Sequence, residues 1–140
     1  MTTISGVGGI DANLAPDAFH RWAEHYYKCK QDFVSPHPFS PVPYFLLCRS
    51  IELELKARHL TVMRQTEVKK AFGHDVMRAY QALPTTEKRL DPADELMLEQ
   101  ASDIYSGKGF EYFYPEDALN AFKRYPDLAT LDRITRSLLG

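Results

Sequence analysis

Arg49, Glu52 and Lys56 are the residues whose types and spacing first suggest chemistry. Glu52 and Lys56 are four positions apart, in the order that favours an ion pair along one helix. Two interpretations follow. The pair is either a solvated surface pair, or it faces another helix and orients residues 73–75 through hydrogen bonds. The second interpretation gives the pair a structural task more than a catalytic one.

The tripeptide Gly73-His74-Asp75 is the second candidate. A glycine permits the left-handed conformation that ends a helix, and Asp75 or His74 can cap the helix that follows. His74 is then either a buried or half-buried corner residue, hydrogen-bonded to the helix that carries Glu52, or part of a site for an acidic or nucleotide ligand. Arg78 lies four residues after His74, so both can share a helix face.

Other motifs give weaker signals. Gly107-Lys108-Gly109 lacks the GxxxxGK[ST] frame and is interpreted as a turn. The aromatic residues at 110–114 favour core or interface packing over stacking on a base. His20, His25 and His37 have no metal-ligand spacing. The sequence therefore predicts no catalytic residue, no metal site and no cofactor, and it contains no GxSxG, HExxH or GxGxxG motif.

Helices are the elements that must position these residues. Apolar residues at three- and four-residue steps, with Asp and Pro at the starts, predict six or seven helices and no convincing sheet. Residues 42–62 carry an apolar arc so wide that this helix must pack on more than one side. We expect residues 110–114 to form an extended loop. The approximate ranges of the predicted helices are 16–31, 42–62, 66–72, 75–83, 92–106, 115–124 and 128 to the C-terminus.

The composition sets the class of protein. The chain has 140 residues with 17 Lys+Arg and 19 Asp+Glu, a net charge of −2, which gives no general affinity for nucleic acid. Its length suits one domain. We expect a flexible N-terminal arm at residues 1–14 and a single all-α bundle at 15–140.

The same composition predicts a cytoplasmic protein. The N-terminus does not read as a signal peptide, and the apolar run at residues 42–48 is far too short to span a membrane. Cys29 and Cys48 have no ligand spacing, so they are best explained as reduced apolar side chains, with a disulfide or metal pair as the alternative.

Two segments resemble one branch of the HEPN superfamily. They are residues 43–57 (PYFLLCRSIELELKA) and 72–76 (FGHDV), and the segment at 105–114 is similar to an aromatic–proline segment of that branch. The resemblance covers residues 42–83 well and 91–138 loosely. It implies an all-α bundle that is frequently dimeric, in a bacterial or archaeal setting such as toxin–antitoxin systems, phage defence or stress responses.

The sequence departs from the superfamily's ribonuclease motif, which is Arg, four to six residues, then His. No Arg–His pair here has that spacing: the intervals are three residues for Arg21–His25 and nine for Arg49–His59 and Arg64–His74. The ribonuclease residues are therefore not carried over. The matched signature positions are Glu52, Lys56, Gly73, His74 and Asp75.

These observations predict a non-catalytic HEPN-like binding or interaction module, acting as a homodimer or beside a partner such as a nucleotidyltransferase. Two alternatives stay open. One is a nucleotide- or anion-binding protein with Lys56, His74 and Arg78 around a cleft. The other is a metal-independent ribonuclease with His74 as the base and Arg49 or Arg78 on the phosphate. Nucleic acid is not the favoured partner, and no membrane partner is expected.

Overall fold

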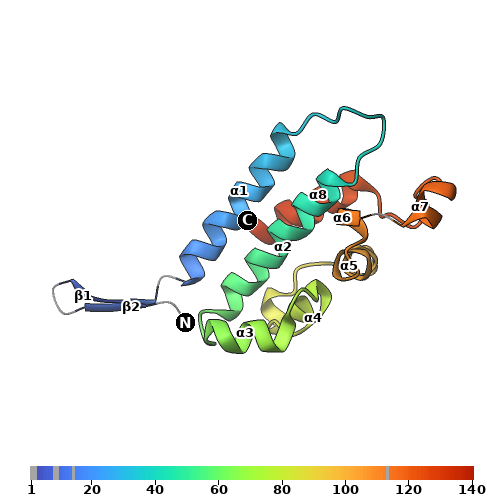
Figure 1. Ribbon diagram of the computed structural model, residues 1–140. Helices are drawn as coiled ribbons and strands as arrows, with labels where there is room; N and C mark the ends of the chain where they lie inside the picture. Colours follow the sequence, from blue (N-terminus) through green and yellow to red (C-terminus); the bar gives the residue numbers. More distant parts are fainter. Residues whose placement is uncertain (1–2, 8–9, 14, 113) are drawn as a thin grey trace.

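Helices make up most of the protein (Figure 1). The computed structural model describes residues 3–7, 10–13, 15–112 and 114–140. Within them the elements are β1 (Thr3–Val7), β2 (Ile10–Asn13), α1 (Ala15–Asp32), α2 (Val42–His59), α3 (Gln65–Phe72), α4 (Val76–Gln81), a 3-10 turn (Thr85–Glu87), α5 (Pro92–Ser106), α6 (Gly109–Tyr112), α7 (Pro115–Leu119) and α8 (Leu128–Leu139). The predicted all-α bundle is therefore confirmed as the body of the fold.

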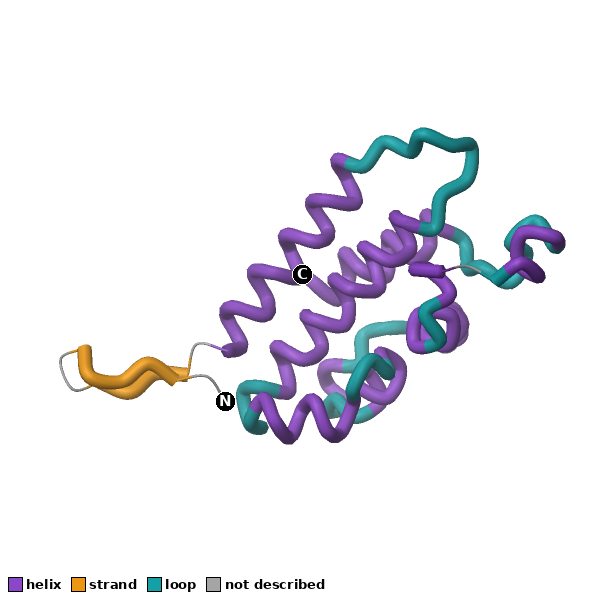
Figure 2. Tube along the Cα trace, in the orientation of Figure 1, coloured by secondary structure: helices purple, strands orange, loops and turns teal. Residues whose placement is uncertain are grey.

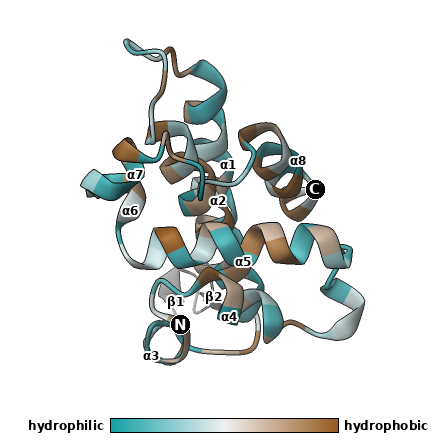
Figure 3. Ribbon diagram, turned by 90° about the vertical axis from the view of Figure 1, so that its right-hand side faces the viewer, coloured by the Kyte–Doolittle hydropathy of each residue, from teal (hydrophilic) through white to brown (hydrophobic). Residues whose placement is uncertain are grey.

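Helix α2 is the centre of that body. It packs against α1, α4, α5, α6 and α8. Its stripe of buried residues runs from Tyr44 through Leu47 and Ile51 to Leu55, and further residues are buried on its other sides. The side of the fold that faces the viewer in Figure 3 shows apolar residues on α5 and α8, both of which contact α2. The sequence correctly predicted a helix covered on more than one side.

Prolines and caps set the helix boundaries. Pro36, Pro38 and Pro41 keep the connection from α1 to α2 out of helix, and Figure 2 shows it as a long arching loop. Asp91 accepts a hydrogen bond from the Asp94 backbone N–H at 2.8 Å and starts α5. Asp127 does the same for α8, with the Thr130 N–H at 3.0 Å.

Four local expectations differ from the structure. Residues 3–7 and 10–13 form an antiparallel hairpin that projects from the helical body (Figure 1). The β-branched residues Thr3, Ile4, Val7 and Ile10 favour extended backbone in these strands. The predicted flexible arm at 1–14 also includes residues 1–2, 8–9 and 14, which lie outside the described residues. The expected loop at 110–114 is helical over Gly109–Tyr112, so eight α-helices are described instead of six or seven. Helix α2 ends at His59 and not at residue 62 as predicted, and the Thr61 hydroxyl donates to the Arg58 carbonyl at 2.8 Å after this end.

The fourth difference lies on α1. The three- and four-residue steps between Phe19, Trp22, Ala23 and Tyr26 predict that these residues share one apolar face of the helix. Ala23 is fully buried, but Trp22 is 57% exposed. The Ala23 carbonyl accepts a hydrogen bond from the Ser50 hydroxyl at 2.7 Å, so α1 approaches α2 through its small residue. The large indole is left outside this close contact.

Candidate anion-binding pocket

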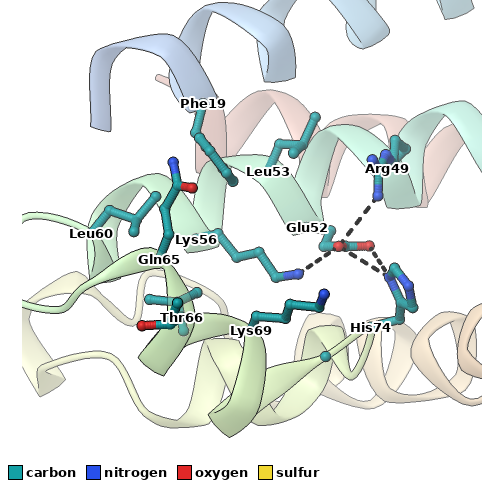
Figure 4. Close-up of a pocket in the computed structure, with 12 residues that line it drawn as sticks. Phe19, Arg49, Glu52, Leu53, Lys56, Leu60, Gln65, Thr66, Lys69 and His74 are labelled. Atoms are coloured by element: carbon teal, nitrogen blue, oxygen red, sulfur yellow. Dashed lines mark hydrogen bonds and ion pairs between the residues drawn. The ribbon is translucent and has the colours of Figure 1, made fainter. Parts of the chain in front are cut away.

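One face of α2 forms the floor of a pocket of about 550 Å³. This face follows the three- and four-residue repeat of a helix. Helix α3 and the corner after it form the opposite wall, and Phe19 of α1 closes one end (Figure 4). The residues of this floor are Arg49, Glu52, Leu53 and Lys56 of α2, with Leu60 directly after its end.

Glu52 is the polar centre of the pocket. It is only 2% exposed, yet its carboxylate has four partners. The Tyr105 hydroxyl donates at 2.5 Å and the Lys56 ammonium at 2.8 Å. The His74 Nδ1 lies 3.2 Å from both carboxylate oxygens, and an Arg49 guanidinium nitrogen lies at 3.4 Å. Helices α2 and α5 and the α3–α4 corner therefore meet at one buried carboxylate.

These partners decide the charge state of Glu52. Burial opposes ionisation, but the hydrogen bonds from Lys56 and Tyr105 together with that from His74 outweigh it, and the pKa of Glu52 is lowered. Burial, reinforced by the Glu52 charge, raises the pKa of Tyr105 well above its usual range. An ionised carboxylate only accepts hydrogen bonds, so His74 Nδ1 carries the proton of that bond.

The α3–α4 corner holds His74 in place. Gly73 has φ 52° and ψ −120°, a backbone conformation that favours glycine, although it is not the left-handed helical one expected. Asp75 accepts from the Arg78 N–H at 3.0 Å and caps α4, as predicted. The Ser106 hydroxyl donates to the His74 carbonyl at 3.1 Å and ties the corner to α5.

Positive charge exceeds negative charge in the lining. Arg49, Lys56 and Lys69 face the one carboxylate of Glu52. Within the described part of the chain, Lys69 has no ion-pair partner, and Figure 4 shows its side chain reaching into the pocket. The remaining wall is largely apolar, formed by residues that include Phe19, Leu53, Leu60 and Val68.

The structure brings together five of the seven candidate residues: Arg49, Glu52, Lys56, Gly73 and His74. Asp75 and Arg78 do not line the pocket, and the Arg78 side chain is exposed. His74 lies at the end of the turn before α4 begins, so it does not share a helix face with Arg78.

Two interpretations of these residues are corrected. The solvated ion pair of Glu52 and Lys56 is wrong, because these side chains are 3% and 12% exposed. The expected hydrogen bond between His74 and α2 is present, but the His74 side chain is 66% exposed and not buried. The imidazole is free to meet a ligand because only its Nδ1 edge is turned to Glu52.

Sequence reasoning missed residues that line the pocket, Lys69 and Phe19 among them, and also Tyr105, which binds its Glu52. Lys69 is one of two adjacent lysines on α3, Phe19 comes from α1, and Tyr105 reaches Glu52 across 53 positions of sequence. The helical period of α3 could have paired Lys69 with the corner at residue 73. No local signal indicates the Tyr105 contact, because it depends on how α5 crosses α2.

The other expected features have structural roles. Phe110 stacks on Tyr44 with centroids 5.3 Å apart, and Tyr125 packs edge-on to both rings, which confirms core packing for this part of the aromatic cluster. Cys48 is buried and Cys29 is half-buried, and both are free. The turn at 107–108 is present, with Lys108 at φ 61°.

No family model matches the chain, and neither a curated protein nor a solved structure matches it. The resemblance to the HEPN superfamily therefore stays a prediction. Among the described residues, no three or more His, Cys, Asp or Glu side chains are grouped to hold a metal ion. In the same part of the chain, no helix has the length and apolar character needed to cross a membrane.

Proposed function

We propose that the protein is a non-catalytic helical binding module whose pocket takes a small organic anion with an apolar body. The observation that carries this proposal is the excess of cationic side chains, Arg49, Lys56 and Lys69, over the single carboxylate in a pocket whose remaining wall is largely apolar. A ligand with a carboxylate or phosphate head would complete that charge balance. Its apolar body would lie against the half-buried ring of Phe19.

The length of the floor sets the size of the ligand. Arg49 and Leu60 are eleven residues apart on α2 and at its end, which corresponds to about 16 Å along a helix axis. A volume of about 550 Å³ lies within the range of small-molecule sites. Inorganic phosphate alone would leave the apolar wall uncovered, so the proposal favours a ligand with both parts.

Thermal shift and calorimetric titration test the proposal with hexanoate, octanoate, hexyl phosphate, phenyl phosphate and nucleoside monophosphates. A true ligand at 100 times its dissociation constant adds about 2.7 kcal/mol, or roughly 10 °C in Tm for a chain of this size. Hexanol and inorganic phosphate, which each lack one half of the ligand, are expected to give no shift.

Two adjacent lysines provide a matched pair of variants. Lys69→Glu reverses a charge in the pocket, whereas Lys70→Glu changes a neighbouring exposed lysine outside it. We expect Lys69→Glu to weaken binding at least tenfold and Lys70→Glu to leave it within twofold. Equal effects of the two variants, or no shift with any organic anion, would overturn the proposal.

A second candidate is a metal-independent ribonuclease, and one observation favours it. His74 and Arg49 contact the same carboxylate, so a base and a phosphate-binding group lie side by side. With Nδ1 protonated toward Glu52, the neutral ring has Nε2 as its basic nitrogen. Incubation with total RNA tests this candidate. Cleavage by the wild type that His74→Ala abolishes would support it, and equal or absent cleavage by both proteins would remove it.

The proposed module would act as a homodimer or beside a partner protein such as a nucleotidyltransferase, in a bacterial stress, defence or toxin–antitoxin setting. This part rests on the HEPN resemblance of residues 43–57 and 72–76 alone. Size-exclusion chromatography with light scattering tests the dimer. A monomer at micromolar concentrations would remove it without affecting the anion-binding proposal.

A further inference from the structure

A second, smaller pocket adjoins the first and shares two of its residues. It has a volume of about 230 Å³, and Arg49 and His74 line both pockets. Its other walls include the rings of Phe45 and Tyr105, whose centroids are 6.0 Å apart at 50° to one another. Arg49 and His74 therefore stand at the junction of the larger pocket and a smaller one, whose lining combines the two rings with Ser106, Lys108 and Glu111.

Neighbouring residues hold both Arg49 and His74 in place at the junction. The Arg49 guanidinium lies between Glu52, at 3.4 Å, and the ring of Tyr26, with its central carbon 5.9 Å from the ring centroid. His74 is held through Nδ1 by Glu52 and through its carbonyl by Ser106. An anion that binds at the junction would meet a guanidinium that is already oriented, which reduces the cost of ordering it.

We propose that the two pockets form one site for a small phosphodiester, with its charge at Arg49 and His74. This inference rests on the proposed function and names the ligand class more closely. A carboxylate is a terminal group, so it cannot extend into both pockets from the junction. A phosphodiester has one negative charge with a substituent on each side, and its oxygens accept the forked hydrogen bonds of a guanidinium.

The two substituents follow from the walls. An apolar chain occupies the larger pocket beside Phe19 and Leu53. A single flat ring occupies the smaller pocket against Phe45 and Tyr105, beside the polar side chains of Ser106, Lys108 and Glu111. A cavity of roughly 150 Å³ is enough for benzene, so a volume of about 230 Å³ is large enough for one ring.

Three probes separate this inference from the proposed function: hexyl phosphate, phenyl phosphate and hexyl phenyl phosphate. Calorimetric titration is expected to show the diester binding at least tenfold more tightly than either monoester. Binding of hexyl phosphate tests only the larger pocket. If hexyl phosphate binds and the diester binds no better, the inference fails while the proposed function stands. If none of the three binds, both fail.

A filling variant locates the ring. Ser106→Phe places a bulky side chain at an exposed position that lines only the smaller pocket, and Asp103→Phe does so at a nearby exposed position of α5 outside it. Because the Ser106 hydroxyl also binds the His74 carbonyl, the measured quantity is the ratio of diester affinity to hexyl phosphate affinity within each variant. We expect this ratio to fall from at least tenfold to within twofold in Ser106→Phe, and Asp103→Phe should keep the wild-type ratio. Circular dichroism and Tm confirm that both variants fold, and a diester advantage that survives in folded Ser106→Phe would overturn the inference.

Discussion

Glu52 and Glu54 are two buried carboxylates of the same helix with opposite surroundings. They are two residues apart on α2, so about 200° of helix rotation places them on opposite sides. Glu52 is 2% exposed and faces the pocket, whereas Glu54 is 5% exposed and faces α1. The pKa of Glu52 is lowered and that of Glu54 is raised.

The surroundings of Glu54 explain its raised pKa. Burial raises it, and the opposing partners are fewer: His20 Nδ1 at 2.6 Å and an Arg58 guanidinium nitrogen at 3.7 Å. Arg58 is also engaged elsewhere, because it donates to the Leu138 carbonyl at 2.5 Å and lies 3.5 Å from Glu87. Glu54 therefore acts as a link from α2 to α1, while Arg58 carries the connection on to the end of α8.

The comparison shows what distinguishes a binding pocket from a structural link on one helix. Around Glu54 the charges are nearly balanced, and each charged group is already paired with another. Around Glu52 the cationic groups outnumber the carboxylate, and the space beside them is open. An anionic ligand can bind where positive charge is in excess next to a cavity. A balanced ion pair gains no charge neutralisation from such a ligand.

Removal of each carboxylate should give the largest difference between the two sites. Glu52→Ala leaves Lys56, 12% exposed, without its partner, and we expect a loss of about 3 kcal/mol in the free energy of unfolding. Glu54→Ala should cost about 1.5 kcal/mol, because His20 can become neutral and Arg58 keeps other partners. Urea unfolding followed by circular dichroism measures both values. Equal losses would remove the distinction.

A single hydroxyl sharpens the comparison at Glu52. Tyr105→Phe deletes the donor at 2.5 Å from the carboxylate and leaves the ring in place. We expect a loss of about 1.5 kcal/mol, the size of a hydrogen bond to a charged group. Tyr112→Phe, at a ring that is 70% exposed, is the matched control and should change stability by less than about 0.5 kcal/mol. A loss no larger than that of the control would mean that Glu52 is held by its cations alone.

The sequence predicted the body of the fold better than its site. The helical period and the Asp and Pro caps gave α1, α5 and α8 almost to the residue, because these signals are local. Glu52, Lys56 and His74 were found because a four-residue step and a glycine corner are also local. The partners of both carboxylates that lie far away in sequence, Tyr105 and His20, were not found.

The reason is physical. The contact between His20 and Glu54 spans 34 positions, and it depends on the close approach of α1 to α2 at Ala23 and Ser50. Neither helix alone indicates that approach. The exposed state of His74 was mispredicted for the same reason: its burial depends on how far α5 covers the corner, which tertiary packing decides.

The smallest expected effect concerns pH, where the two sites should act in opposite directions. The hydrogen bond to Glu54, partly offset by burial, raises the pKa of His20 above 6.5. Its contribution to stability is therefore complete below pH 6.5 and is lost as the pH rises through the folded value. Glu52, with its lowered pKa, contributes above pH 4.5 and loses that contribution as the pH falls through its folded value.

His20→Asn tests the part of the pH dependence that lies above pH 6.5, where His20 loses its contribution to stability. We expect the variant to lose the pH-dependent fall in stability above pH 6.5, a change of about 0.5 kcal/mol because the His20 side chain is 37% exposed and screened by solvent. Unfolding free energies at pH 6 and pH 9 measure it. His25→Asn, on the exposed side of the same helix, should keep the wild-type slope. If His20→Asn also keeps the wild-type slope, the interaction with Glu54 does not hold the proton on His20. Glu54 would then differ from Glu52 only in the number of its partners and not in how it responds to pH.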